Sequence, residues 1–169
     1  MSATANLSLS GTSSHRTNTI LKATIIAGTL DISLACLNFY FKTQKSPVLV
    51  LQYIASAVFG KSAYTSDTMM PLIGLLFHYI VAFIWTTIFF LSYPKLISLV
   101  RNGIVAGLLY AILIWCLMNL LVLPLTLVPK SSFNLVSALT GTLILMIAIG
   151  LPLALIMKKY YQRPDRANV

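Results

Sequence analysis

The sequence predicts an all-α, multi-pass membrane protein. Of its 169 residues, 58% are hydrophobic and only 9% are charged, whereas soluble domains carry roughly 25% charged residues. The apolar residues gather in four long runs, each about as long as the roughly 20 residues that a helix needs to cross a bilayer. We therefore expect a transmembrane helical bundle. Its four predicted spans cover residues 20–41, 69–93, 103–128 and 134–157.

Polar tails flank this transmembrane domain of residues 20–157. Residues 1–19 include nine serine or threonine residues and show no apolar periodicity, which predicts a disordered tail. Residues 158–169 are rich in lysine and arginine, which predicts a basic tail beside the membrane surface.

The apolar segment between the first two spans is short. Ser46 and Pro47 favour a helix start, and Gly60 favours a helix end. The intervening residues 47–59 would rise about 20 Å, less than the roughly 30 Å hydrocarbon core. We therefore expect an interfacial or re-entrant helix. If this segment spans instead, the chain has five spans and termini on opposite faces, an arrangement that the charge pattern alone does not exclude.

The net charge of +9 arises at the ends of the apolar runs. Basic residues at such positions are typical of membrane anchors and topology signals. They do not form a basic patch with interleaved aromatic residues, so we expect no nucleic-acid partner. With four spans, eight basic residues lie on one side and four on the other, which predicts that both termini are cytoplasmic. The larger set is Arg16, Lys22, Lys95, Arg101, Lys158, Lys159, Arg163 and Arg166, and the smaller is Lys42, Lys45, Lys61 and Lys130.

Small residues predict where the helices touch. Gly103 and Gly107 are four residues apart in the third span, and Gly141 and Gly28 lie within the fourth and first. Without a hydrophobic driving force inside lipid, small residues favour close packing of backbones.

Three prolines mark expected interruptions. Pro94 follows Tyr93 at the end of the second apolar run and predicts the end of that helix. Pro124 and Pro152 are expected to bend the third and fourth spans.

An aspartate in the middle of the first span is the most informative polar residue. A lipid-facing aspartate costs at least about 2.5 to 3.5 kcal/mol, so Asp31 is expected to face the bundle interior. Asn38 lies seven residues later, on the same helix face. His78 and Asn119, in the second and third spans, lie at comparable depths. We expect these four residues to form an intramembrane polar cluster.

Two interpretations of this cluster remain open at the level of sequence. An Asp–His pair could accept and release a proton, or bind a small cation or a lipid head group, as in a small transporter, channel or proton-responsive component. Alternatively, the polar residues only join the helices, at about 0.6 kcal/mol for each hydrogen bond. The protein would then be a structural or assembly partner of another membrane protein.

Catalytic and cofactor-binding patterns are absent from the sequence. There is no catalytic triad, zinc-binding spacing or nucleotide fingerprint, and the chain has no glutamate. The carboxylates Asp31, Asp67 and Asp165 fall at three different levels of the predicted topology. Cys36 and Cys116 lie within apolar runs, as buried thiols do. We expect no enzyme, no metal and no cofactor; the expected partners are membrane lipids, a second copy of the chain or another membrane protein.

Residues 74–129 also carry a set of features that occur together. They are His78 followed by a long apolar run, the Tyr93–Pro94 pair, Gly103 and Gly107, and the Pro124–Leu125 pair. With these features, about a third of the chain resembles the YagU-like family of uncharacterised inner-membrane proteins. The resemblance implies a protein of the bacterial cytoplasmic membrane whose relatives include some linked to acid tolerance. It implies no catalytic residues.

Overall fold

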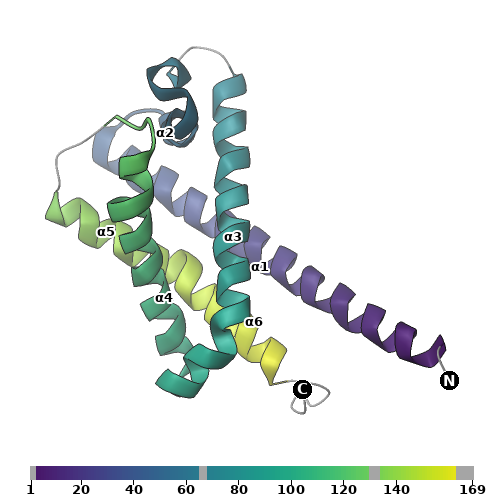
Figure 1. Cartoon of the computed structure of the whole chain (residues 1–169). Helices are drawn as coiled ribbons and strands as arrows, with labels where there is room; N and C mark the ends of the chain where they lie inside the picture. Colours follow the sequence, from purple (N-terminus) through teal and green to yellow (C-terminus); the bar gives the residue numbers. More distant parts are fainter. Residues whose placement is uncertain (1–2, 65–67, 130–133, 163–169) are drawn as a thin grey trace.

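The computed structural model describes residues 3–64, 68–129 and 134–162, and within this part of the chain it contains helices and no strand (Figure 1). The α-helices are α1 (Ala3–Thr43), α2 (Val48–Phe59), α3 (Met69–Val100), α4 (Gly103–Leu117), α5 (Leu135–Leu145) and α6 (Leu151–Tyr161). Two π turns, Met118–Val122 and Met146–Gly150, follow α4 and α5. The 3-10 turns Gly60–Ala63 and Leu123–Leu125 follow α2 and the first π turn.

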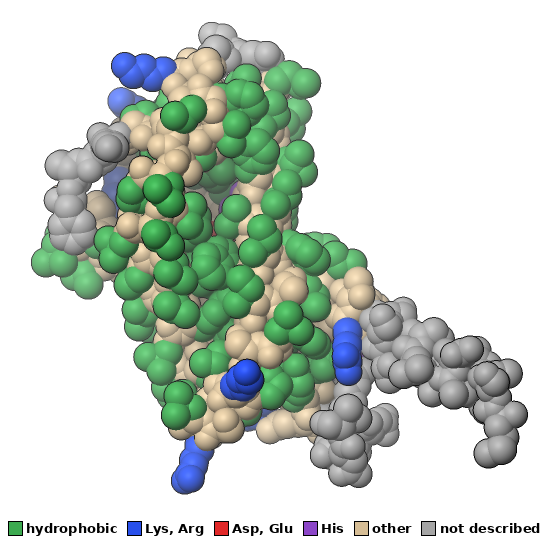
Figure 2. Space-filling model, in the orientation of Figure 1, with side chains coloured by type: hydrophobic (Ala, Val, Ile, Leu, Met, Phe, Trp, Pro, Cys, Tyr) green, Lys and Arg blue, Asp and Glu red, His purple; other side chains and the backbone are tan. Residues whose placement is uncertain are grey.

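Four helical segments of the described chain are long and apolar enough to cross a membrane. They are His15–Thr43, Met69–Val100, Gly103–Leu125 and Leu135–Tyr161, with 29, 32, 23 and 27 residues. A shorter apolar helix, Val48–Ala63, lies between the first two. Figure 2 shows hydrophobic side chains across the middle of one face and basic side chains toward its two ends. The predicted fold class of four long helices and one short helix is confirmed.

We call the continuous run of α5, the second π turn and α6 the last helix. α3 and the last helix form the centre of the bundle. α1 and α4 each pack against both α3 and the last helix, and α2 packs across the start of α3 (Figure 1). We call the end of the bundle that holds α2 the α2 end, and the opposite end, where α6 finishes, the C-terminal end.

The buried core lies in the half of the bundle nearer the C-terminal end. Its members come from all four long helices, and none comes from α2 or α5. They are Ala23, Ala27, Phe89, Phe90, Tyr93, Tyr110, Ile114, Ala148, Ile149, Leu153, Met157 and Tyr160. Near the α2 end, α5 and the π turn Met118–Val122 have no buried residue. Buried residues at that end include Gln52, Ala55 and Ser56 of α2 and Ala63 of the 3-10 turn that follows it.

The prediction that the second span ends at Pro94 is wrong, because α3 continues through this proline to Val100. A proline inside a helix leaves the carbonyl four residues earlier without its N–H partner. That carbonyl belongs to Phe90, and it accepts a hydrogen bond of 2.9 Å from the Tyr161 hydroxyl of α6. A tertiary contact thus replaces the missing helical bond, and no local pattern around Pro94 announces it.

Pro124 and Pro152 both follow a π turn. The Met118 carbonyl accepts a hydrogen bond from the Leu123 N–H, and the Met146 carbonyl accepts one from the Leu151 N–H. The predicted interruptions therefore take the form of a wider helical turn just before each proline.

α1 begins at Ala3, whereas the composition predicts a disordered tail over residues 1–19. Once an apolar segment has nucleated a helix, adding further residues costs little. The polar segment continues the same helix, and the Thr19 hydroxyl donates to the His15 carbonyl. At the other end of the chain, the predicted basic tail is described only as far as Gln162. Asp67, Lys130, Arg163, Asp165 and Arg166 lie outside the described residues.

Candidate functional site

α1 and α3 make a polar contact at Gly28 and His78. The Nε2 atom of His78 lies 2.8 Å from the Gly28 carbonyl oxygen. A carbonyl oxygen only accepts hydrogen bonds, so Nε2 must carry the proton of this bond. The other ring nitrogen, Nδ1, takes no part in this bond.

The absence of a side chain at Gly28 permits this contact. A methyl group at this position would lie 3.2 Å from the Tyr79 ring and 3.3 Å from the Ala82 side chain. Next to it, the Thr29 and Tyr79 hydroxyls form a second bond between the helices, 2.8 Å long. Gly28 therefore sets the distance at which side chains of α3 reach the backbone of α1.

Asp31 lies on α1 one turn after Gly28. Its side chain is half-buried, and its carboxyl group interacts electrostatically with His78. Both residues lie well inside segments long enough to cross a membrane. The structure therefore brings together the aspartate and the histidine that the sequence singles out.

The two asparagines of the predicted cluster are placed differently. Asn38 is half-buried and lies two turns beyond Asp31 on α1, toward the α2 end. Asn119 is also half-buried, and its side-chain amide donates to the Trp115 carbonyl of its own helix at 2.9 Å. α4, which precedes the turn of Asn119, packs against α3 and the last helix. α1 packs against these same two helices. The structure thus pairs Asp31 with His78 electrostatically, and the cluster of four stays a prediction.

The predicted packing glycines lie at close contacts between helices. Gly107 faces the Gly150 carbonyl in the second π turn, and a methyl group at Gly107 would lie 2.8 Å from the Ala154 side chain. Gly103 lies beside the Tyr93 hydroxyl, and Gly141 beside the Trp115 indole.

Two glycine contacts were not predicted. Gly74 of α3 lies directly against the Leu51 carbonyl of α2, and Gly150 forms the other side of the Gly107 contact. The position of Gly74 four residues before His78 is visible in the sequence. The partner of Gly74 on α2 could not be predicted from the sequence, because tertiary packing determines the side on which α2 folds back.

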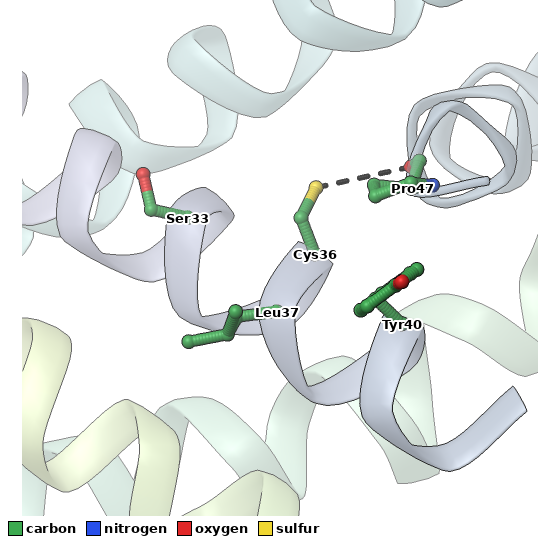
Figure 3. Close-up of a pocket in the computed structure, with 5 residues that line it drawn as sticks. All are labelled: Ser33, Cys36, Leu37, Tyr40 and Pro47. Atoms are coloured by element: carbon green, nitrogen blue, oxygen red, sulfur yellow. Dashed lines mark hydrogen bonds between the residues drawn. The ribbon is translucent and has the colours of Figure 1, made fainter. Parts of the chain in front are cut away.

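A shallow groove lies between α1 and the start of α2 (Figure 3). Figure 3 shows the Cys36 side chain pointing toward Pro47, whose carbonyl lies 3.8 Å from the Cys36 Sγ. The groove is lined by Ser33, Cys36, Leu37, Tyr40 and Pro47. Its lining is mostly apolar. Among the residues that the structure describes, no group of three or more His, Cys, Asp or Glu side chains could hold a metal ion.

The chain matches no protein-family model, no curated protein and no solved structure.

Proposed function

We propose that this integral membrane protein is a small proton-linked transporter or channel in which Asp31 and His78 take up and release a proton. The observation that supports the proposal most is the contact between α1 and α3. It holds the His78 imidazole against the α1 backbone one helical turn from Asp31, whose carboxyl group interacts electrostatically with His78, and both lie within segments long enough to cross a membrane. Ionisable residues in such positions are costly to insert and are functional candidates by default.

Charge balance favours one shared proton on this pair. A carboxylate beside an imidazolium, and a carboxylic acid beside a neutral imidazole, both have zero net charge. Removing the proton leaves one uncompensated negative charge in surroundings of low dielectric constant, which is expensive. Histidine is the residue type that proteins most often use for proton exchange near neutral pH.

Among the described residues, Tyr79 is a titratable neighbour of the pair, with its ring 5.5 Å from the His78 ring between centroids. Tyr79 of α3 and Cys36 of α1 lie on the same elements, and Tyr53 lies on α2. Phenols and thiols are ordinarily neutral near pH 7. We therefore assign the expected pH dependence to Asp31 and His78.

Proton flux into vesicles tests this function. The purified protein is placed in liposomes that contain a pH-sensitive dye, and a pH difference is imposed across the membrane. We expect proton flux with the wild type and none with Asp31→Asn, because the amide cannot exchange a proton. Tyr79→Phe, which removes only the neighbouring bond to Thr29, is the matched control and should keep its flux.

Two results would refute the proposal. One is a wild-type protein that carries no protons although circular dichroism shows it folded. The other is an Asp31→Asn variant whose flux equals that of the wild type.

The alternative function is that of a structural or assembly partner for another membrane protein. The observation that favours it is the exposed apolar face of α5, which is available to a partner helix and is formed by Leu135, Val136, Leu139 and Leu143. A stable complex recovered with the protein from its own membranes, together with absence of flux, would support this alternative.

The expected setting is the bacterial cytoplasmic membrane with both termini inside the cell. Six described basic residues support this orientation at the C-terminal end, namely Arg16, Lys22, Lys95, Arg101, Lys158 and Lys159, against Lys42, Lys45 and Lys61 at the α2 end. The resemblance to the YagU-like family agrees with this setting. An enzymatic role is not part of the proposal, and lipids or a second copy are the expected partners.

A further inference from the structure

We infer that a groove between α1 and α3 binds an acyl chain of an anionic phospholipid, and that Lys22 at the rim of this groove binds the lipid phosphate. The inference rests on the membrane-spanning fold and on the charge of the chain, and it does not depend on proton transport. It gives a site and a chemical class to the lipid partner that the proposed function leaves general.

The groove lies where α1 and α3 separate. Figure 1 shows α1 crossing α3 obliquely and leading away from it toward the start of the chain. At the crossing the helices are in close contact, because a methyl group at Gly28 would lie 3.2 Å from the Tyr79 ring. The groove runs from this contact toward the C-terminal end, has a volume of about 400 Å³ and is apolar. Its walls are Leu21, Thr24 and Ile25 of α1 and Tyr79, Ile80 and Phe83 of α3.

The walls of the groove lie on the outer surface of the bundle. Leu21 and Ile25 are 46% and 59% exposed, and Ile80 and Phe83 are 47% and 41% exposed. All four lie in segments long enough to cross a membrane, so in a membrane their exposed surface meets lipid. An acyl chain in the groove contacts two helices, whereas a chain on a flat surface contacts one. Dispersion attraction therefore favours the groove.

Lys22 places a positive charge at the rim of this groove. Its side chain is exposed, and it lies one position after Leu21 and three before Ile25, so it borders the α1 wall. Helical side chains lean toward the start of their helix, which for α1 is the C-terminal end of the bundle. A lysine in an apolar segment also extends its ammonium group toward the head groups. The charge of Lys22 is thereby directed to the level of the lipid phosphates.

No carboxylate of the described chain neutralises this charge. The one acidic residue that the structure describes is Asp31, nine residues further along α1, which is about 14 Å at 1.5 Å per residue. Five more described basic residues lie at the same end of the bundle, namely Arg16, Lys95, Arg101, Lys158 and Lys159. An apolar groove with an uncompensated ammonium group at its rim is complementary to an anionic phospholipid.

Fluorescence quenching by brominated lipids tests this site. Trp85 and Trp115 are first replaced by phenylalanine in the full-length protein, and a single tryptophan is placed at Phe83 in the groove or at Ile84 outside it. Each variant is reconstituted in vesicles that mix phosphatidylglycerol and phosphatidylcholine, with bromine on the acyl chains of one lipid or the other. Bromine quenches a tryptophan that it contacts, so the two experiments together give the relative binding constant of the two lipids at that position.

We expect phosphatidylglycerol to bind at least about fivefold more strongly than phosphatidylcholine at Phe83→Trp, since one basic residue near the membrane surface has an effect of that order. At Ile84→Trp, on a surface of α3 that is 49% exposed, the ratio should be close to one. Lys22→Gln should lower the ratio at position 83 by at least about a factor of two. Lys42→Gln, at the other end of α1, is the matched control and should leave it unchanged.

A ratio close to one at position 83, or a ratio that Lys22→Gln leaves unchanged, would overturn the inference. A tryptophan at position 83 that neither brominated lipid quenches would also overturn it and would indicate that a second copy of the chain covers the groove. Ile25→Trp, on the opposite wall, repeats the measurement without enlarging the ring at position 83, and circular dichroism excludes misfolding. Loss of lipid selectivity with intact proton flux would refute the lipid site alone, and selectivity without flux would refute the proposed function alone.

Discussion

Gly107→Ala should destabilise the bundle, although alanine is the better helix former. A methyl group at Gly107 would collide with the Gly150 carbonyl and lie 2.8 Å from the Ala154 side chain. Both groups are backbone or are attached directly to it, so a change of rotamer cannot relieve the contact. Overpacking costs typically about 1–3 kcal/mol, whereas the helix preference of alanine over glycine returns only about 1 kcal/mol. We expect a net loss of up to about 2 kcal/mol.

Unfolding in detergent micelles, followed by circular dichroism during titration with dodecyl sulfate, measures this loss. Gly141→Ala is the matched control, because its methyl group meets only the movable Trp115 indole, at 3.1 Å. The control should retain wild-type stability or gain slightly. A Gly107→Ala variant as stable as Gly141→Ala would show that α4 and the last helix are not packed as described.

Gly74→Ala should release α2 from α3. At this position a methyl group would overlap the Leu51 carbonyl and lie 2.8 Å from its carbon and 3.3 Å from the Ala55 nitrogen. All three atoms belong to the backbone of α2, so the whole short helix must move. Because α2 holds the buried Gln52 and Ser56 against the bundle, we expect local loosening at the α2 end and not global unfolding.

Hydrogen exchange followed by mass spectrometry locates this effect. Peptides covering Val48–Ala63 should exchange at least about tenfold faster in Gly74→Ala. This change corresponds to a loss of about 1.4 kcal/mol in the free energy of local opening. Peptides covering α6 should exchange as in the wild type. Unchanged exchange in the α2 peptides would contradict the packing of α2 against Gly74.

Composition was sufficient to predict the fold class. A run of more than 20 apolar residues has few stable alternatives to a membrane-spanning helix, and the length of the segment after Pro47 separates the short helix from the long ones. The ends of the helices were less predictable, because they depend on contacts between segments far apart in the chain. The continuation of α3 through Pro94 is supported by Tyr161, which lies 67 residues later.

The candidate site was predictable from the sequence to a similar extent as the fold. Asp31 and His78 stand out because each is an isolated polar residue in an apolar run, and the cost of exposing the aspartate to lipid directs it inward. The sequence does not show in the same way which helices pack against one another, because the four apolar segments have comparable lengths. As a result, the sequence grouped Asn119 with Asp31, whereas the structure assigns its amide to Trp115. The roles of Gly74 and Gly150 were hidden for the same reason.

Infrared difference spectroscopy of the carboxyl groups tests the central claim most directly. The chain has only three acidic side chains, so Asp67→Asn and Asp165→Asn together leave Asp31 as the sole side-chain carboxyl group. As pH is varied between about 5 and 8, the range in which histidine titrates, the account predicts a carboxyl band that changes with pH. This band should vanish in Asp31→Asn and move to a different pH range in His78→Gln. A carboxyl band that stays constant over this range, or one indifferent to the loss of His78, would contradict the account.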